Sequence, residues 1–321
     1  MRRTALILLL LCGSAPGAYQ SRERFTIKWG DAADQLKITP EELYYGEDSL
    51  NIEYHPGIGP SLGLVDDREN VMIISRQFSQ LKCFDHEGHL ILDKENLETG
   101  ICRADPVDAY IDSSSHFYLT IDPPLNYVPV ADMEGRLLER LFPYADTLAK
   151  IERMYSDISG ELFFWANPDT DYVAYGPYGF RRVANSCMMA ANGYLYAVHD
   201  CNDEYPFHIL IVRYYSPERL SPPLSVESTY IDMAGDSIFQ AVLLEGGNGS
   251  ALYVLVDRLR QNYGLIYEFD LAYEKIDQIL TPYPNSKYNS RIAPFVDRQG
   301  RIYEFRFMDD GLHVVKWTKE Q

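Results

Sequence analysis

Residues 82–93 read KCFDHEGHLILD, and residues 131–140 read ADMEGRLLER. Both stretches contain the pattern D-x-E-G-x-L between two runs of alternating apolar residues. A metal site would keep its ligands, but the second stretch has methionine and arginine at the positions of His86 and His89. The shared residues are typical of a β-hairpin turn in which glycine adopts a positive φ. The pattern therefore predicts a solvated turn between two strands rather than a metal centre.

A second unit recurs upstream of these turns and consists of a short strand, a polar turn and a strand rich in β-forming residues. It occurs six times, as LVDDRENVMII, YIDSSSHFYLTI, YSDISGELFFW, MAANGYLYAV, LLEGGNGSALYVLV and FVDRQGRIYEF. Repeats that are irregularly spaced and contain only strands indicate a β-propeller rather than a solenoid. Helical periodicity is weak, and residues 36–43 and 146–153 would form at most a turn or two of helix.

The repeats divide the chain into four-stranded units, whose strands are called A to D here. The last unit supplies only three strands, at 291–296, 301–307 and 312–318, before the chain ends. The missing outer strand has a candidate near the other terminus, RFTIKWG at 24–30. Such a strand would join the ends of a ring and cover exposed strand edges. We therefore predict an all-β, six-bladed β-propeller with mostly four-stranded blades, the last blade closed by an N-terminal strand.

At this point the chain resembles the six-bladed propellers of the NHL and TolB-like kind. The resemblance is carried by CFDHEGHLIL (83–92), VADMEGRLLE (130–139) and VDRQGRIYEF (296–305). It implies the same propeller architecture over nearly all of residues 19–321. It also implies that assembly or ligand binding is a more frequent role than catalysis, because this architecture hosts many unrelated functions.

The N-terminus has the pattern of a secretory signal peptide. Arg2 and Arg3 precede a short apolar run that is followed by small residues, so we predict cleavage near residue 18 and a single domain at 19–321. The run is much shorter than the roughly 20 residues of a transmembrane helix. The prediction is a periplasmic or extracellular protein. The alternative is a lipoprotein anchored to the cell envelope through Cys12, although leucine rather than a small residue precedes that cysteine.

The formal net charge is −18. A chain this acidic is repelled by nucleic acid and by anionic lipid, which excludes both as partner classes. Cations and basic partners remain compatible with it, although acidity also promotes solubility. The disulfide state of the remaining cysteines is open, because connectivity does not follow from sequence: Cys83, Cys102, Cys187 and Cys201.

Binding residues are expected in the loops that join strands B and C, because loops on a rigid scaffold carry function. These loops are rich in carboxylates, with a few arginines among them. The candidate binding residues are Asp169, Asp171, Asp200, Asp203, Glu204, Arg258, Arg260, Asp309 and Asp310. Clustered carboxylates would suit Ca²⁺, but residues 200–204 (DCNDE) lack the glycine and the distal glutamate of a known calcium loop. General surface acidity explains the same residues.

No sequence motif points to catalysis: GxSxG, HExxH, the P-loop and GxGxxG are all missing from the chain. We therefore predict an exported, non-enzymatic platform that binds an envelope or extracellular protein, a peptide or a glycan through its B–C loop face. The alternative is a metal-dependent hydrolase or lyase, lactonase-like, acting on a small sugar-derived substrate at the channel mouth. Its metal ligands cannot be matched to residues of this chain.

Overall fold

A computed structural model describes most of the chain from residue 19 onward. The described residues are 19–38, 42–45, 52–55, 59–75, 78, 80–95, 105–122, 124–132, 136–144, 150–151, 153–156, 162–165, 172–176, 179–183, 189–191, 194–201, 208–215, 224–232, 238–244, 251–258, 263–270, 275–282 and 292–319.

The regular structure of these residues is β-strand. They form six four-stranded antiparallel sheets and one two-stranded sheet. Sheet 1 contains β4 (Leu62–Val65), β5 (Val71–Ser75), β6 (Gln80–Phe84) and β7 (Leu90–Glu95). Sheet 2 contains β8 (Asp105–Ile111), β9 (Phe117–Asp122), β10 (Val128–Ala131) and β11 (Leu137–Leu141). Sheet 3 contains β12 (Arg153–Ser156), β13 (Leu162–Trp165), β14 (Tyr172–Gly176) and β15 (Gly179–Val183).

The second half of the chain repeats the pattern. Sheet 4 contains β16 (Met189–Ala191), β17 (Tyr194–Cys201), β18 (His208–Tyr215) and β19 (Leu224–Asp232). Sheet 5 contains β20 (Ile238–Leu243), β21 (Ala251–Arg258), β22 (Tyr263–Asp270) and β23 (Lys275–Pro282). Sheet 6 contains β24 (Phe295–Val296), β25 (Ile302–Met308), β26 (Gly311–Lys319) and β1 (Tyr19–Lys28). The two-stranded sheet is the hairpin of β2 (Glu42–Tyr45) and β3 (Ile52–His55).

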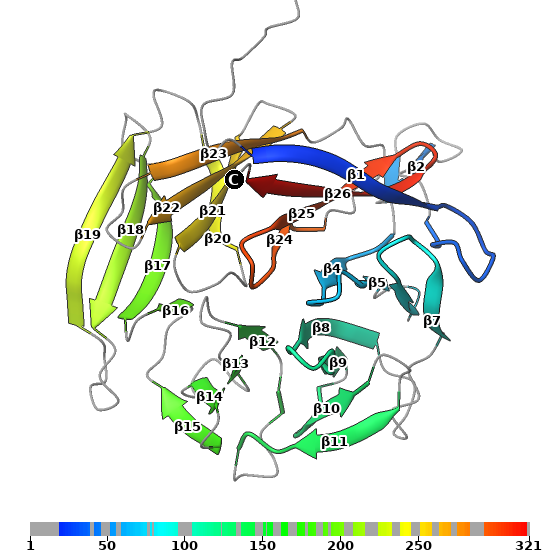
Figure 1. The fold of residues 1–321 in the computed structure, drawn as a ribbon, viewed down its shortest axis with the longest axis horizontal. Helices are drawn as coiled ribbons and strands as arrows, with labels where there is room; N and C mark the ends of the chain where they lie inside the picture. The colour runs from blue at the N-terminus through cyan, green and yellow to red at the C-terminus, as the bar shows by residue number, and fades with distance from the viewer. Residues whose placement is uncertain are drawn as a thin grey trace, which may run out of the picture.

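The four-stranded sheets are arranged around a common centre, with their first strands innermost (Figure 1). This is the arrangement of a β-propeller, in which each sheet is one blade. The predictions of an all-β chain and of four-stranded antiparallel sheets are confirmed.

The core lies between neighbouring sheets. Strands β5 and β6 are buried along their whole length, because a middle strand is covered on both faces by adjacent sheets. One apolar cluster joins sheets 1 and 2, another joins sheets 2 and 3, and a third joins sheets 5 and 6. A fourth cluster joins sheet 6 to sheet 1 and includes Ile27, Phe84 and Phe305. The packing therefore links the last sheet to the first.

The predicted N-terminal outer strand is present and pairs with the C-terminal strand. β1 runs antiparallel to β26, from Tyr19 opposite Lys319 to Lys28 opposite Gly311. The strand begins at Tyr19, several residues before the predicted start at 24. The innermost strand of sheet 6, β24, is shorter than the predicted segment 291–296, since residues 292–294 are not in a strand.

The two stretches with weak helical periodicity contain no helix among their described residues. Leu36 forms an isolated bridge to Trp29, and residues from Glu42 onward form the hairpin strand β2. Arg153, at the end of the second weakly helical stretch, begins β12. Tyrosine and β-branched residues favour strands, and here they outweigh a short apolar periodicity.

Candidate functional site

Five of the hairpin turns have the same architecture, in which an aspartate organises the turn through its side chain. In each turn, the aspartate N–H donates to the carbonyl oxygen of the residue four positions later. Its Oδ1 atom accepts a hydrogen bond from the N–H of that same residue. The five residues are Asp66, Asp85, Asp112, Asp132 and Asp297. These local hydrogen bonds explain why an aspartate recurs at the start of the repeated turns.

The turn at Asp85 accounts for the carboxylate and histidine contacts of this stretch through its own hydrogen bonds. Asp85 Oδ1 accepts from the N–H groups of Glu87 and His89, both at 2.9 Å, and Oδ2 lies 3.1 Å from His89 Nδ1. Burial alone would raise the pKa of Asp85, but these hydrogen bonds hold it below its usual value. Asp85, Glu87 and His89 each place one ligand atom within 4.8 Å of the others. Since Asp85 is already engaged by its own turn, the geometry explains this cluster as a turn.

The fourth residue is described in four of these turns, and in all four it adopts a positive φ. Gly88 has φ of 90° and Gly300 has φ of 73°, but Glu69 has φ of 65° and Ser115 has φ of 61°. A Cβ atom at Gly88 would lie 2.7 Å from the ring of Phe25, so glycine is also required there by space. Glu69 and Ser115 hold an unfavourable backbone conformation, and both use their side chains to contact another turn.

Those contacts join the turns of neighbouring sheets. Ser115 Oγ in sheet 2 donates to Asp66 Oδ2 in sheet 1 at 2.9 Å. Arg301 Nη1 in sheet 6 donates to Glu69 Oε1 in sheet 1 at 2.7 Å. The three turns of sheets 6, 1 and 2 are thus linked through their side chains.

Two arginines extend this network. Arg298 Nη2, from the sheet 6 turn, donates to the hydroxyl of Tyr110 in sheet 2 at 2.7 Å. Arg24, from β1, lies 3.2 Å from the Glu69 carboxylate, which also accepts from Lys316 Nζ at 2.7 Å. Burial would raise the pKa of Glu69, but hydrogen bonding to Lys316 and the nearby positive charges lower it. Glu69 therefore neutralises cations from both strands that close sheet 6.

We call the side of the sheets that carries the five aspartate turns the turn face. Consecutive connections in an antiparallel sheet alternate between its two ends, so the first and third turns of each sheet lie on this side. The second connections, between strands B and C, and the links from one sheet to the next leave from the opposite side, which we call the loop face. The described members of the predicted binding set lie at B–C connections, on the loop face: Asp200, Arg258, Asp309 and Asp310.

Asp309 and Asp310 lie on the loop face, in the tight turn between β25 and β26, and are exposed. Asp310 Oδ1 lies 2.8 Å from His313 Nε2, and His313 Nδ1 lies 3.2 Å from Glu23 Oε2 in β1. Burial would lower the pKa of His313, but the hydrogen bonds to the two carboxylates raise it above its usual value. This pair of contacts fastens β1 to the B–C turn of sheet 6.

The remaining predicted binding residues are only partly placed. Asp200 stands near the end of β17, opposite Ile209, and Arg258 ends β21, opposite Ile238. Both precede B–C loops, as expected. The others lie outside the described residues: Asp169, Asp171, Asp203, Glu204, Arg260 and the alternative lipidation residue Cys12. The idea that these side chains converge on one site remains a prediction.

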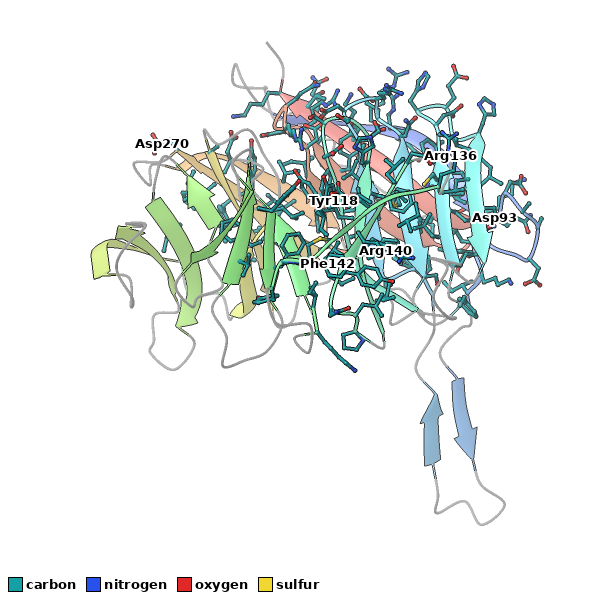
Figure 2. The ribbon with its side chains drawn as sticks, turned by 90° about the horizontal axis from the view of Figure 1, so that it is seen from below. Asp93, Tyr118, Arg136, Arg140, Phe142 and Asp270 are labelled. Carbon is teal, nitrogen blue, oxygen red and sulfur yellow. The ribbon has the colours of Figure 1, made fainter. Side chains whose placement is uncertain are left out.

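The hairpin β2–β3 also belongs to the loop face. Figure 2 labels Arg136 on the turn face and Phe142 on the other side of the sheets, and the hairpin projects well beyond the side of Phe142. It is inserted in the connection from β1 to β4, which links the last sheet to the first. The sequence analysis did not predict this hairpin, because residues 36–43 resemble a weak helical pattern.

Sequence reasoning also missed the residues that complete the aspartate turns. Four positions after the aspartate stand side chains that reach its Oδ2 atom: Asn70, His89, His116, Arg136 and Arg301. A comparison of all five turns at that spacing would have found them, because each residue is a hydrogen-bond donor. His89 and His116 are therefore explained by the turns.

Two of the four cysteines beyond the predicted signal peptide lie in the described residues. Cys83 is a buried free cysteine, and burial raises the pKa of its thiol. Cys201 is the last residue of β17, opposite His208, whereas Cys102 and Cys187 lie outside the described residues. Among the described residues, no helix has the length and apolar character needed to cross a membrane.

Comparisons with known proteins give structural neighbours only. No family model and no curated protein matches the chain. A virginiamycin B lyase from Staphylococcus aureus matches with a TM-score of 0.46 and 12% identity, over 88% of this chain and 99% of that one. A calcium-binding protein, regucalcin, from Agrobacterium tumefaciens matches with a TM-score of 0.42 and 9% identity, over 80% and 88%. A luciferin-regenerating enzyme gives 0.43 and 10%, over 81% and 91%. Such values assign no activity, so the fold rests on the strand order above.

Proposed function

We propose that the chain is an exported β-propeller of six blades, of the NHL or TolB-like kind, that acts as a non-enzymatic binding platform. In this proposal β1 closes the last blade. The ligand is a protein, peptide or glycan of the cell envelope or the extracellular space. It binds on the loop face, where the B–C loops and the links between blades meet.

The observation that supports the platform most strongly is the difference between the two faces. On the turn face, the five aspartates are engaged by the N–H groups and side chains of their own turns. Side-chain contacts also join neighbouring turns across sheets 6, 1 and 2. The loop face carries a projecting hairpin and the exposed carboxylates of Asp309 and Asp310, of which Asp310 also contacts His313. Binding residues concentrate in loops carried by a rigid scaffold, so the loop face is the expected binding surface.

The test is binding to matched variants of the two faces. The mature chain is screened by thermal melting against peptide and glycan panels, since a ligand at about 100 times its dissociation constant adds about 2.7 kcal/mol of stability. Binding of each hit is then measured to Asp309→Asn/Asp310→Asn on the loop face and to His86→Ala/Glu87→Gln on the turn face. We expect weaker binding to the first variant and unchanged binding to the second. The reverse pattern would sink the assignment of the loop face.

The same melts separate this proposal from an enzymatic one. They are repeated with EDTA and with Ca²⁺, Mg²⁺ and Zn²⁺ added singly. A shift of several degrees with one cation, followed by hydrolysis of a sugar lactone, would replace the platform with the hydrolase reading. The absence of any cation effect would count against that reading.

Export is tested on the protein from cell fractions. A mature N-terminus near residue 19 in the periplasm or medium is the expected result. A mass that corresponds to a diacylated Cys12 would change the proposal to an envelope-anchored protein.

A further inference from the structure

The β2–β3 hairpin is a small sheet with no partner sheet in the described part of the chain. Its two strands pair with each other and, among the described strands, with no others. The sheet lies apart from the propeller body (Figure 2). An isolated two-stranded hairpin is marginally stable in water, and its edges present unpaired backbone N–H and C=O groups. Both properties make the hairpin a ready template for another strand.

The register gives the hairpin two different faces. Leu43 stands opposite Tyr54, and Tyr45 stands opposite Ile52. Residues directly opposite each other share a face, and neighbours along a strand alternate between faces. One face therefore carries Leu43, Tyr45, Ile52 and Tyr54. The other carries Glu42, Tyr44, Glu53 and His55.

The negative charge of the hairpin limits which classes of molecule can bind it. Residues 38–58 contain no lysine or arginine, and their carboxylates are Glu41, Glu42, Glu47, Asp48 and Glu53. A second copy of the chain would bring the same acidic hairpin and the same net charge of −18, so it would be repelled. An anionic lipid surface would be repelled for the same reason. A cationic polypeptide is complementary to the hairpin.

We propose that the β2–β3 hairpin is a docking element for a basic polypeptide strand in which cationic and apolar residues alternate. The strand adds to an edge of the hairpin and makes it three-stranded. Its apolar residues extend the face of Leu43, Tyr45, Ile52 and Tyr54. Its lysines or arginines extend the opposite face, beside Glu42 or Glu53, where opposite charges across strands are favourable. The inference rests on the proposed function and names the partner class for one part of the loop face.

A charge swap on the full mature chain tests this assignment. The probes are an octapeptide of alternating lysine and valine and an octapeptide of alternating glutamate and valine, each labelled for fluorescence anisotropy. The native chain is expected to bind the lysine peptide and not the glutamate peptide. In Glu42→Lys/Glu53→Lys, the affinity for the lysine peptide should fall by roughly tenfold, and the glutamate peptide should now bind. Amide hydrogen exchange should slow in residues 42–45 or 52–55 when the lysine peptide is present.

The control is Asp309→Lys/Asp310→Lys, which makes the same charge change elsewhere on the loop face. If the peptide preference switches in this control and not in the hairpin variant, the hairpin assignment is overturned while the loop-face platform stands. If the lysine peptide binds neither the native chain nor either variant, the hairpin proposal fails, and the peptide and glycan screen still decides the platform. Two other results would also overturn the hairpin proposal. One is binding to phosphatidylglycerol vesicles without peptide preference, and the other is dimerisation that disappears in the hairpin variant.

Discussion

The Arg301 guanidinium donates a hydrogen bond to the Glu69 carboxylate at 2.7 Å, although 232 positions separate the two residues in the chain. Arg301 belongs to the first turn of sheet 6, and Glu69 belongs to the first turn of sheet 1. The pair therefore links the last sheet to the first on the turn face. It also explains why Glu69 occupies a backbone conformation that is given to glycine in two of the related turns.

Replacing Glu69 with glutamine should destabilise this junction. Glu69→Gln keeps the shape of the side chain but leaves Arg301, Lys316 and Arg24 without their common counter-charge, so we expect a loss of about 1–2 kcal/mol. The loss should shrink at high salt, because screening weakens the repulsion among the cations. Urea denaturation at low and high salt measures it. Glu87→Gln, at an exposed turn position, is the control, and an equal loss there would contradict the role of Glu69.

Asp66 and Asp67, which are adjacent in one turn, should differ strongly in their contribution to the free energy of unfolding. Asp66 is buried and accepts from the N–H groups of Arg68 and Asn70 and from the Ser115 hydroxyl. Asp66→Ala should cost about 3–5 kcal/mol, because one buried donor and two partly buried donors lose their acceptor. Asp67 is exposed and faces Arg298 at 3.8 Å, so Asp67→Ala should cost below about 1 kcal/mol. Chemical denaturation of the two variants side by side decides this, and similar losses would refute the shared turn architecture as a source of stability.

The contact between Gly63 and Phe305 tests the packing of sheet 1 on sheet 6. A Cβ atom at Gly63 would lie 2.6 Å from the Phe305 ring. Gly63→Ala should therefore destabilise the protein by about 1–3 kcal/mol through overpacking. Phe305→Leu should make room for the new methyl group, so the double variant should be more stable than the sum of the single losses by at least about 0.5 kcal/mol. Additive losses in the double-mutant cycle would show that the two residues do not touch in solution.

The link between His313 and its two carboxylates should make stability depend on pH. The pKa of His313 is raised, so its contribution is complete below the unfolded value of about 6.5 and disappears as the pH rises through the higher folded value. The pKa values of Glu23 and Asp310 are lowered by hydrogen bonds to His313, so their contribution is lost as the solution becomes strongly acidic. His313→Gln should be less stable than the native chain near pH 6, and the difference should narrow near pH 9.

NMR titration of the His313 ring supplies the direct measurement. Its pKa should fall in Asp310→Asn, because the substitution removes one of the two carboxylates that favour the imidazolium. An unchanged His313 pKa in that variant would mean that the contact with Asp310 does not form in solution.

The turns show how far sequence reasoning reached into the candidate site. The pattern around Asp85 and Asp132 predicted tight hairpin turns and ruled against a histidine metal site, because such a turn is formed by residues close together in the chain. The same pattern did not reveal that Glu69 would bind cations from three other segments. A residue other than glycine at this turn position does not indicate which distant side chains will contact it.

On the loop face, the sequence predicted where residues lie but not the contacts that they make. The sequence named Asp309 and Asp310 as exposed loop residues, which is where the structure places them. It gave no indication that His313 and Glu23 would join that turn to β1, since the contact depends on pairing between the two ends of the chain. The hairpin β2–β3 was not predicted, because residues 36–43 are too few for their periodicity to separate strand from helix.

The sequence by itself determined most strands of the four-stranded sheets, the aspartate turns and the acidity of this protein, because these depend on alternation, on turn chemistry within five residues and on composition. Only the tertiary structure decided which sheets are neighbours, which turns are linked across them and which hairpin has no partner sheet among the described residues. Contacts such as Glu69 with Arg301 arise when distant segments are brought side by side, and their energies come from burial and charge that no short stretch of sequence contains.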